Sequence, residues 1–185
     1  MLADVLKTRI DSIAQVDPGK AIELREIVRA SNRGLLGRDA AAKQMAEILG
    51  VDHEEILSSA DNGEVKNEQL AEFIKTLRPD FKLAMLSNVR SRERVEQRFN
   101  TGELDELFDD VVASGDVGFI KPEREIYELT AARLGVQPEE CVMIDDIREF
   151  CDGAEAVGMR AIQFTSTDQA INDLTALIDS EKERY

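Results

Sequence analysis

The sequence is poor in cysteine and in positive charge, and each shortage excludes a class of protein. Its 185 residues include two cysteines, Cys141 and Cys151, which do not stand at a metal-binding spacing. We expect two reduced, buried thiols rather than a disulfide framework. Lysine and arginine number 23 against 38 aspartates and glutamates, so the formal net charge is −15. Because this excess repels phosphate backbones, we expect no nucleic-acid partner.

Long hydrophobic runs are missing as well. No apolar stretch approaches the roughly 20 residues that a membrane-spanning helix needs. No basic segment followed by an apolar run opens the sequence, so we expect no secretory signal, no membrane partner and a cytoplasmic location. The apolar fraction of 43% is ordinary for globular proteins. A packed core with a small accessory unit is therefore expected.

Hydrophobic periodicity divides the chain into a helical part and a mixed part. Apolar residues recur at helical spacing in five early segments, at about residues 2–15, 22–31, 40–49, 54–59 and 67–77. Beyond Phe81, short apolar runs alternate with amphipathic segments. The expected strands are 82–86, 110–113, 141–144 and 160–164, and the expected helices are 91–100, 124–134, 149–157 and 169–180. This alternation predicts an α/β fold with a doubly wound parallel sheet over residues 65–185, preceded by a helical subdomain over 1–64.

Polar residues follow three of the expected strands. Ser87 and Asn88 come after the first strand, Lys121 after the loop that follows the second, and Asp145 with Asp146 after the third. Ligands of such sheets bind at the carboxyl ends of the strands, so these side chains could converge. Taken singly, they also fit turn residues, a solvated lysine and helix N-caps. Two adjacent carboxylates repel each other unless a cation lies between them, and Mg²⁺ suits such oxygen ligands.

In this order, three segments resemble motifs of the haloacid dehalogenase (HAD) superfamily of phosphohydrolases. Residues 83–88 resemble its second motif, residues 114–122 its third, and residues 142–146 its fourth. The resemblance extends over about residues 66–170. It implies the family's Rossmann-like sheet, and it implies that the early helices are a cap.

The resemblance also implies a site and an activity. Ser87 would donate a hydrogen bond to a phosphoryl oxygen, and Lys121 would neutralise phosphoryl charge. Asn88 belongs to the same catalytic group, whereas Asp146, assisted by Asp145, would bind Mg²⁺. The implied activity is a magnesium-dependent phosphatase that acts on a small phosphate ester.

One motif of the family is missing. Its first motif is an apolar strand followed by Asp-x-Asp, which supplies the nucleophile. Asp4, Asp11 and Asp17 are the early candidates, and none follows a strand-like run. Phe150 also replaces a residue that is often polar in relatives. Because loss of a nucleophile typically lowers the rate about a million-fold, we expect a truncated or nucleophile-less hydrolase that is inactive as this chain and binds Mg²⁺ weakly.

The missing strand would be the central one, between the strands that precede Ser87 and Asp145. Its loss would leave a gap of about twice the usual 4.8 Å spacing. Met1 to Lys7 are a poor substitute because their apolar spacing is helical. We expect either direct pairing of the two edges or a homo-oligomer that fills the gap, and favour the oligomer.

Other functions stay open at this stage. A non-catalytic pseudoenzyme would bind a ligand or protein partner through the same residues. A haloacid dehalogenase would also use an aspartate nucleophile, although the Asp145–Asp146 pair favours phosphoryl chemistry. A phosphoacceptor signalling domain is disfavoured because such domains place the acidic pair first and the lysine last.

Overall fold

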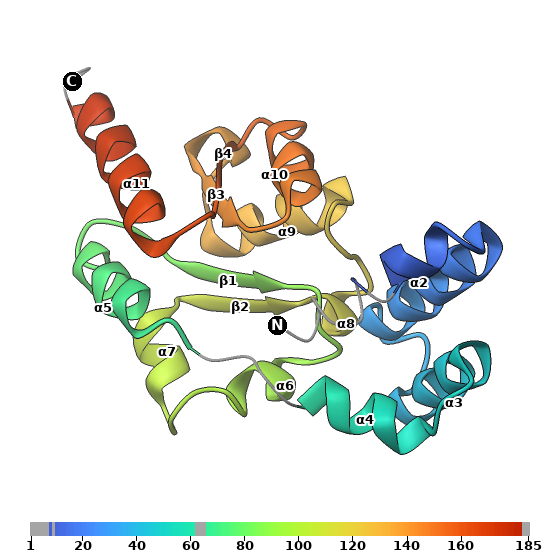
Figure 1. Ribbon diagram of the computed structural model, residues 1–185. Coiled ribbons are helices and arrows are strands. Elements are labelled where there is room, and N and C mark those ends of the chain that lie inside the picture. Colours follow the sequence, from blue (N-terminus) through green and yellow to red (C-terminus); the bar gives the residue numbers. More distant parts are fainter. Residues whose placement is uncertain (1–7, 9, 62–65, 183–185) are drawn as a thin grey trace. The chain divides into compact units, whose positions relative to one another are not determined.

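The computed structural model describes residue 8 and residues 10–61 and 66–182. They form two compact units whose segments alternate along the chain (Figure 1). The first unit combines the described residues up to 61 with Asn88–Arg98 and Ala113–Ile120, and the second holds the remainder. The predicted boundary between residues 64 and 65 lies outside the described residues, as do Met1 to Lys7. Among the described residues, no helix is long and apolar enough to span a membrane.

The first unit is helical. Residues 10–14 are helical, and the named helices are α2 (Pro18–Asn32), α3 (Arg38–Leu49), α4 (His53–Asp61), α6 (Arg92–Glu96) and α8 (Ser114–Val117). Helix α2 begins with a proline at its first position, and the Asp17 carboxylate accepts a hydrogen bond from Lys20 N. Helix α3 ends at Gly50, whose φ of 66° belongs to the left-handed region. These signals are local, so the sequence predicted the presence of α2 and α3.

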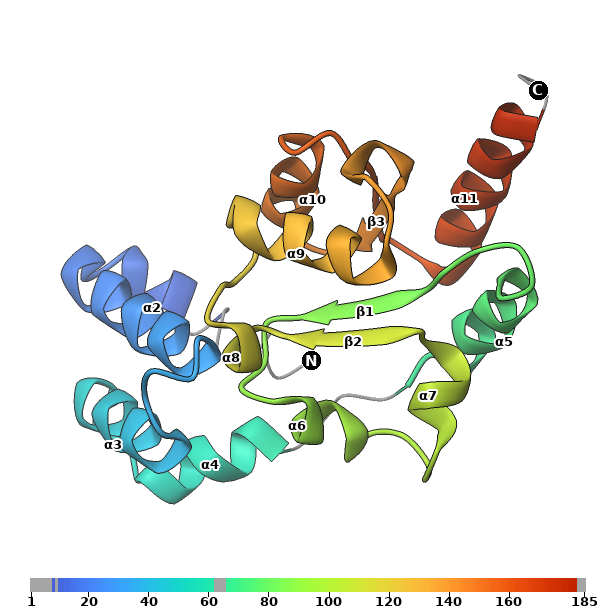
Figure 2. The same cartoon turned by 180° about the vertical axis from the view of Figure 1, so that it is seen from behind.

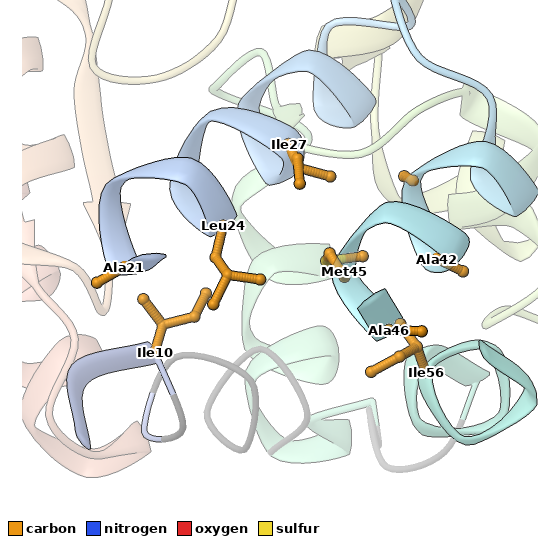
Figure 3. Packing of buried hydrophobic residues seen from close by; sticks show 9 residues of the cluster. Ile10, Ala21, Leu24, Ile27, Ala42, Met45, Ala46 and Ile56 are labelled. Atoms are coloured by element: carbon orange, nitrogen blue, oxygen red, sulfur yellow. The ribbon is translucent and has the colours of Figure 1, made fainter. Parts of the chain in front are cut away.

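Apolar side chains of the first four helical segments form one core (Figure 3). Its buried members are Ile10, Ala21, Leu24, Ile27, Ala41, Ala42, Met45, Ala46 and Ile56. Four of these are alanines, which let the helix backbones approach closely. Full burial of one leucine side chain contributes about 1.5–3 kcal/mol. The larger side chains therefore carry most of the stability of this small core.

Two later segments, Asn88–Arg98 and Ala113–Ile120, also belong to the first unit, and their backbones lie close to each other. The Val89 carbonyl accepts a hydrogen bond from Gly115 N at 2.9 Å. A Cβ atom at Gly115 would lie 2.0 Å from the Arg90 carbonyl oxygen, so only glycine fits there. The segment after residue 113, expected to be a loop, begins with the short helix α8. Such a helix, four residues long, is too short to show hydrophobic periodicity.

The second unit holds the strands. They are β1 (Ala84–Ser87), β2 (Asp110–Ala113), β3 (Val142–Asp145) and β4 (Arg160–Gln163). Its helices are α5 (Glu68–Leu77), α7 (Glu103–Leu107), α9 (Arg124–Leu134), α10 (Arg148–Glu155) and α11 (Thr167–Lys182), with a 3₁₀ turn η1 at Pro138–Glu140. Helix α9 packs against β1, which Figure 2 shows from behind, and α10 packs against β3 and β4. The prediction missed α7, a short acidic helix.

The strands form two separate sheets instead of the single sheet that was predicted. Strand β1 pairs with β2, and β3 pairs with β4. Both pairs are parallel. Strand β3 pairs with β4 in a register that places Val142 opposite Arg160 and Asp145 opposite Gln163. The arrows of β1 and β2 point the same way in Figure 1. Direct pairing between β1 and β3 does not occur in the described part of the chain. The expected oligomer stays a prediction.

We predict that Leu24→Ala destabilises the helical unit by about 2–5 kcal/mol, because truncation of a buried leucine leaves a cavity. Leu24 is fully buried, whereas Ile22 on the same helix is 60% exposed. Ile22→Ala is the matched control, with an expected change within about 0.5 kcal/mol. Urea denaturation followed by circular dichroism measures both. Equal losses for the two variants would contradict this core.

Candidate functional site

The Lys121 side chain joins the carboxyl ends of β1 and β3. Its Nζ donates to the Leu86 carbonyl at 3.0 Å and to Asp145 Oδ2 at 2.5 Å. The two charged side chains are 7% and 8% exposed. Coulomb attraction is strong where water is scarce. The lysine therefore links the end of β1 to the end of β3.

The Asp145 carboxylate is held from two sides. While Oδ2 accepts from Lys121, Oδ1 accepts from Ile147 N at 2.9 Å, at the start of α10. Both oxygens are therefore engaged within the protein. The predicted N-cap role fits this second bond, because the carboxylate binds a main-chain N–H just before the helix.

Two aromatic residues lie near the ion pair. The Phe150 ring centroid lies 5.0 Å from Lys121 Nζ, a distance that suits a cation–π interaction. The buried Tyr127 hydroxyl donates to the Phe150 carbonyl at 2.7 Å. Burial, reinforced by the negative charge of Asp145, raises the pKa of Tyr127. Sequence reasoning recognised Phe150 as a departure from the family pattern and missed its place over the lysine, because that contact depends on how α10 packs.

A glycine permits this packing. A Cβ atom at Gly153 would lie 2.8 Å from Pro122 Cβ and 2.9 Å from the Tyr127 hydroxyl. Helix α10 can therefore approach the lysine-bearing loop and α9 only with glycine at this position. The close approach keeps Phe150 within reach of Lys121.

The other predicted site residues are less constrained. Ser87 ends β1 and is partly exposed, and its hydroxyl makes no hydrogen bond with another described residue. Asp146 is exposed, and its carbonyl accepts from Gln163 Nε2 at 3.2 Å. Asn88, partly exposed, belongs to the first unit. The structure thus brings Lys121 to Asp145. The convergence of Ser87, Lys121, Asp145 and Asp146 in one cleft stays a prediction.

The described residues offer few carboxylates for a magnesium ion. None of them form a group of three or more histidine, cysteine, aspartate or glutamate side chains that could hold a metal ion. Asp145 is already engaged by Lys121 and Ile147, which leaves Asp146 as the available carboxylate of the pair. Mg²⁺ favours six oxygen ligands and is usually bound through one or two carboxylates together with water and substrate phosphate.

The two cysteines differ in environment. Both are free thiols; Cys151 is buried, whereas Cys141 is partly exposed. The expectation of two buried thiols is therefore wrong for Cys141, which precedes β3 and lies beside an acidic turn. Burial raises the pKa of both thiols, so neither is poised as a nucleophile.

Comparisons with known proteins decide the family. The family model described as haloacid dehalogenase-like hydrolase matches residues 4–158, most of the chain. The chain belongs to the haloacid dehalogenase-like hydrolases. A phosphorylated carbohydrates phosphatase of Thermotoga maritima is 33% identical over 109 residues, which cover 59% of this chain and 48% of that protein. The chain thus spans about half the length of the curated relatives it matches.

Solved structures show the same HAD-like fold. A HAD family enzyme of Bacteroides thetaiotaomicron, crystallised with magnesium and inorganic phosphate, has a TM-score of 0.65 at 20% identity, covering 88% of this chain and 86% of that one. The L-2-haloacid dehalogenase of Xanthobacter autotrophicus has a TM-score of 0.58 at 19% identity, covering 92% and 77%. These likenesses establish the fold alone.

We predict that Lys121→Met lowers the free energy of unfolding by about 3–5 kcal/mol, because it leaves the Asp145 carboxylate buried without a counter-charge. Adding Asp145→Asn should restore much of the loss, since the amide is neutral and can still accept from Ile147. The control is Lys43→Met, which removes an exposed ion pair to Asp39 and should produce no measurable change. Urea denaturation at neutral pH measures all three. No rescue by the second substitution would contradict the burial of this pair.

Proposed function

We propose that this HAD-like chain carries the phosphoryl-binding part of a phosphatase for small phosphate esters. The observation that carries the proposal is the buried Lys121 ammonium at the carboxyl ends of β1 and β3. Ligands of open α/β sheets bind at these ends, and a fixed cation there attracts a phosphoryl group. The phosphatases among the related proteins support the same chemistry.

Each site residue has a proposed part in binding. Lys121 neutralises charge on the phosphoryl oxygens while its amine donates to Leu86 O and Asp145 Oδ2. Ser87 donates its hydroxyl to a phosphoryl oxygen, which is consistent with the absence of a partner among the described residues. Asn88 follows Ser87 in the chain, and its proposed place in the site rests on the resemblance of residues 83–88 to the second HAD motif.

Magnesium has a limited place in this proposal. A related enzyme was crystallised with magnesium and phosphate, which supports a metal-dependent reaction in the family. In this chain Asp145 is engaged by protein groups, so the exposed Asp146 would be the main protein ligand. One carboxylate binds Mg²⁺ weakly, so no reaction step is assigned to the metal.

Binding of inorganic phosphate tests the proposal. Ser87→Ala should weaken binding about ten-fold, because a hydrogen bond to a charged group contributes about 1.5–3 kcal/mol. Ser87 has no described partner, so the variant should remain as stable as the parent chain. Isothermal titration calorimetry measures the affinity, and Ser180→Ala on the exposed face of α11 is the control. Equal affinities for all three proteins would remove Ser87 from the site.

We also predict negligible hydrolysis of p-nitrophenyl phosphate in the presence of Mg²⁺. No Asp-x-Asp follows an apolar strand in the sequence, so the reaction has no assigned nucleophile. A steady-state assay of p-nitrophenol release, with Asp146→Ala as the comparison variant, measures the rate of hydrolysis. Turnover of about 1 per second or more, abolished in that variant, would show that another carboxylate has taken over the role.

The second candidate is a non-catalytic protein that binds a ligand or partner. It is favoured by the buried ion pair between Lys121 and Asp145, because each of these charges is neutralised by the other without a ligand. Phosphate binding without hydrolysis would fit both candidates, whereas turnover would exclude this one. The dehalogenase alternative rests on fold likeness alone.

A further inference from the structure

Arg90, in the first unit, differs from the arginines around it. In the same unit, Arg25 pairs with a carboxylate at 2.9 Å and Arg92 pairs with one at 2.8 Å. Arg90 forms no ion pair with any described carboxylate, and its Nη2 donates to the Leu36 carbonyl at 3.4 Å. The chain has 38 acidic residues against 23 basic ones. An arginine without a carboxylate is therefore an exception that asks for a physical reason.

Two acids that adjoin the segments around Arg90 have other partners. Asp39 pairs with the Lys43 amine at 2.8 Å. Asp116 accepts a hydrogen bond from the main-chain N–H of Arg92, also at 2.8 Å. The negative charge that would balance Arg90 is therefore not supplied by these two side chains.

A second cation adds to the cost of the Arg90 charge. Arg90 is partly buried, and Arg38, which donates to the Leu57 carbonyl at 3.0 Å, lies close enough to repel it. Burial, reinforced by the positive charge of Arg38, lowers the pKa of the Arg90 guanidinium. An arginine nevertheless stays charged in proteins. A bound anion would offset both costs, because it is attracted by each guanidinium.

The backbone that carries Arg90 is closely packed. A Cβ atom at Gly115 would lie 2.0 Å from the Arg90 carbonyl oxygen, and one at Gly34 would lie 2.8 Å from the Gly115 carbonyl oxygen. The buried Ser114 hydroxyl donates to the Asn32 carbonyl at 2.6 Å. The start of the side chain is therefore fixed before a ligand arrives, which lowers the entropy cost of binding.

We propose that Arg90, assisted by Arg38, binds one oxyanion group of a small ligand, either a carboxylate or a phosphate. A guanidinium presents a planar fork of N–H donors that matches two oxygens of either group. The net charge of −15 disfavours a long acidic polymer, so a small anion is the better ligand. The site lies within the first unit and is independent of the phosphoryl site proposed at Lys121.

NMR of the arginine Nε–H groups on the full chain tests the site. The Arg90 signal is assigned by its loss in Arg90→Met. It should shift to saturation when inorganic phosphate or acetate is added at constant ionic strength, and the comparison of the two anions identifies the preferred group. The Arg25 signal is the internal control and should change little, because Arg25 is exposed and already paired with Asp11.

Variants separate this site from the Lys121 site and from a structural role. Saturation of the Arg90 signal should persist in Ser87→Ala. In Arg90→Lys, the Arg38 signal should report an affinity about ten-fold lower, because the lysine cannot offer the fork. Arg90→Met should leave the urea midpoint unchanged or raise it, since it removes a partly buried charge without a described counter-charge.

Four results would each overturn the proposal. The first is an Arg90 signal that does not saturate with either anion. The second is an Arg25 signal that follows the same titration curve, because the shift would then be nonspecific. The third is the loss of saturation in Ser87→Ala, which would assign the anion to the Lys121 site. The fourth is a lower urea midpoint for Arg90→Met, as expected of an arginine with a structural role.

Discussion

The Lys121 ammonium is the group on which this arrangement depends. It contacts a carbonyl of β1 and a carboxylate of β3, and no β-ladder joins these strands in the described structure. A buried charge is stable only with a close partner and further polar contacts, and Asp145, Leu86 and the ring of Phe150 provide them. The ion pair therefore serves as a structural joint as well as the centre of the candidate site.

Much of the fold could be predicted from local signals. The bounds of β2 and α9 agree with the sequence prediction, because strong apolar runs and a glycine stop mark them. Helices α7 and α8 were missed because four or five residues cannot display a helical repeat. For the site, the order of polar residues after the strands identified Lys121 and Asp145, and the HAD-like resemblance gave these residues their proposed roles.

The sequence by itself determined the family, the residue types at the strand ends and the excess of negative charge, since all three are written in order and composition. Only the tertiary structure decided that the strands form two sheets, that Lys121 closes on Asp145 beneath Phe150, and that Asn88 belongs with the helical unit. The reason is physical. Periodicity reports which face of an element is buried, whereas pairing of strands and of charges depends on segments far apart in the chain, whose hydrogen bonds and desolvation are settled only when they pack together.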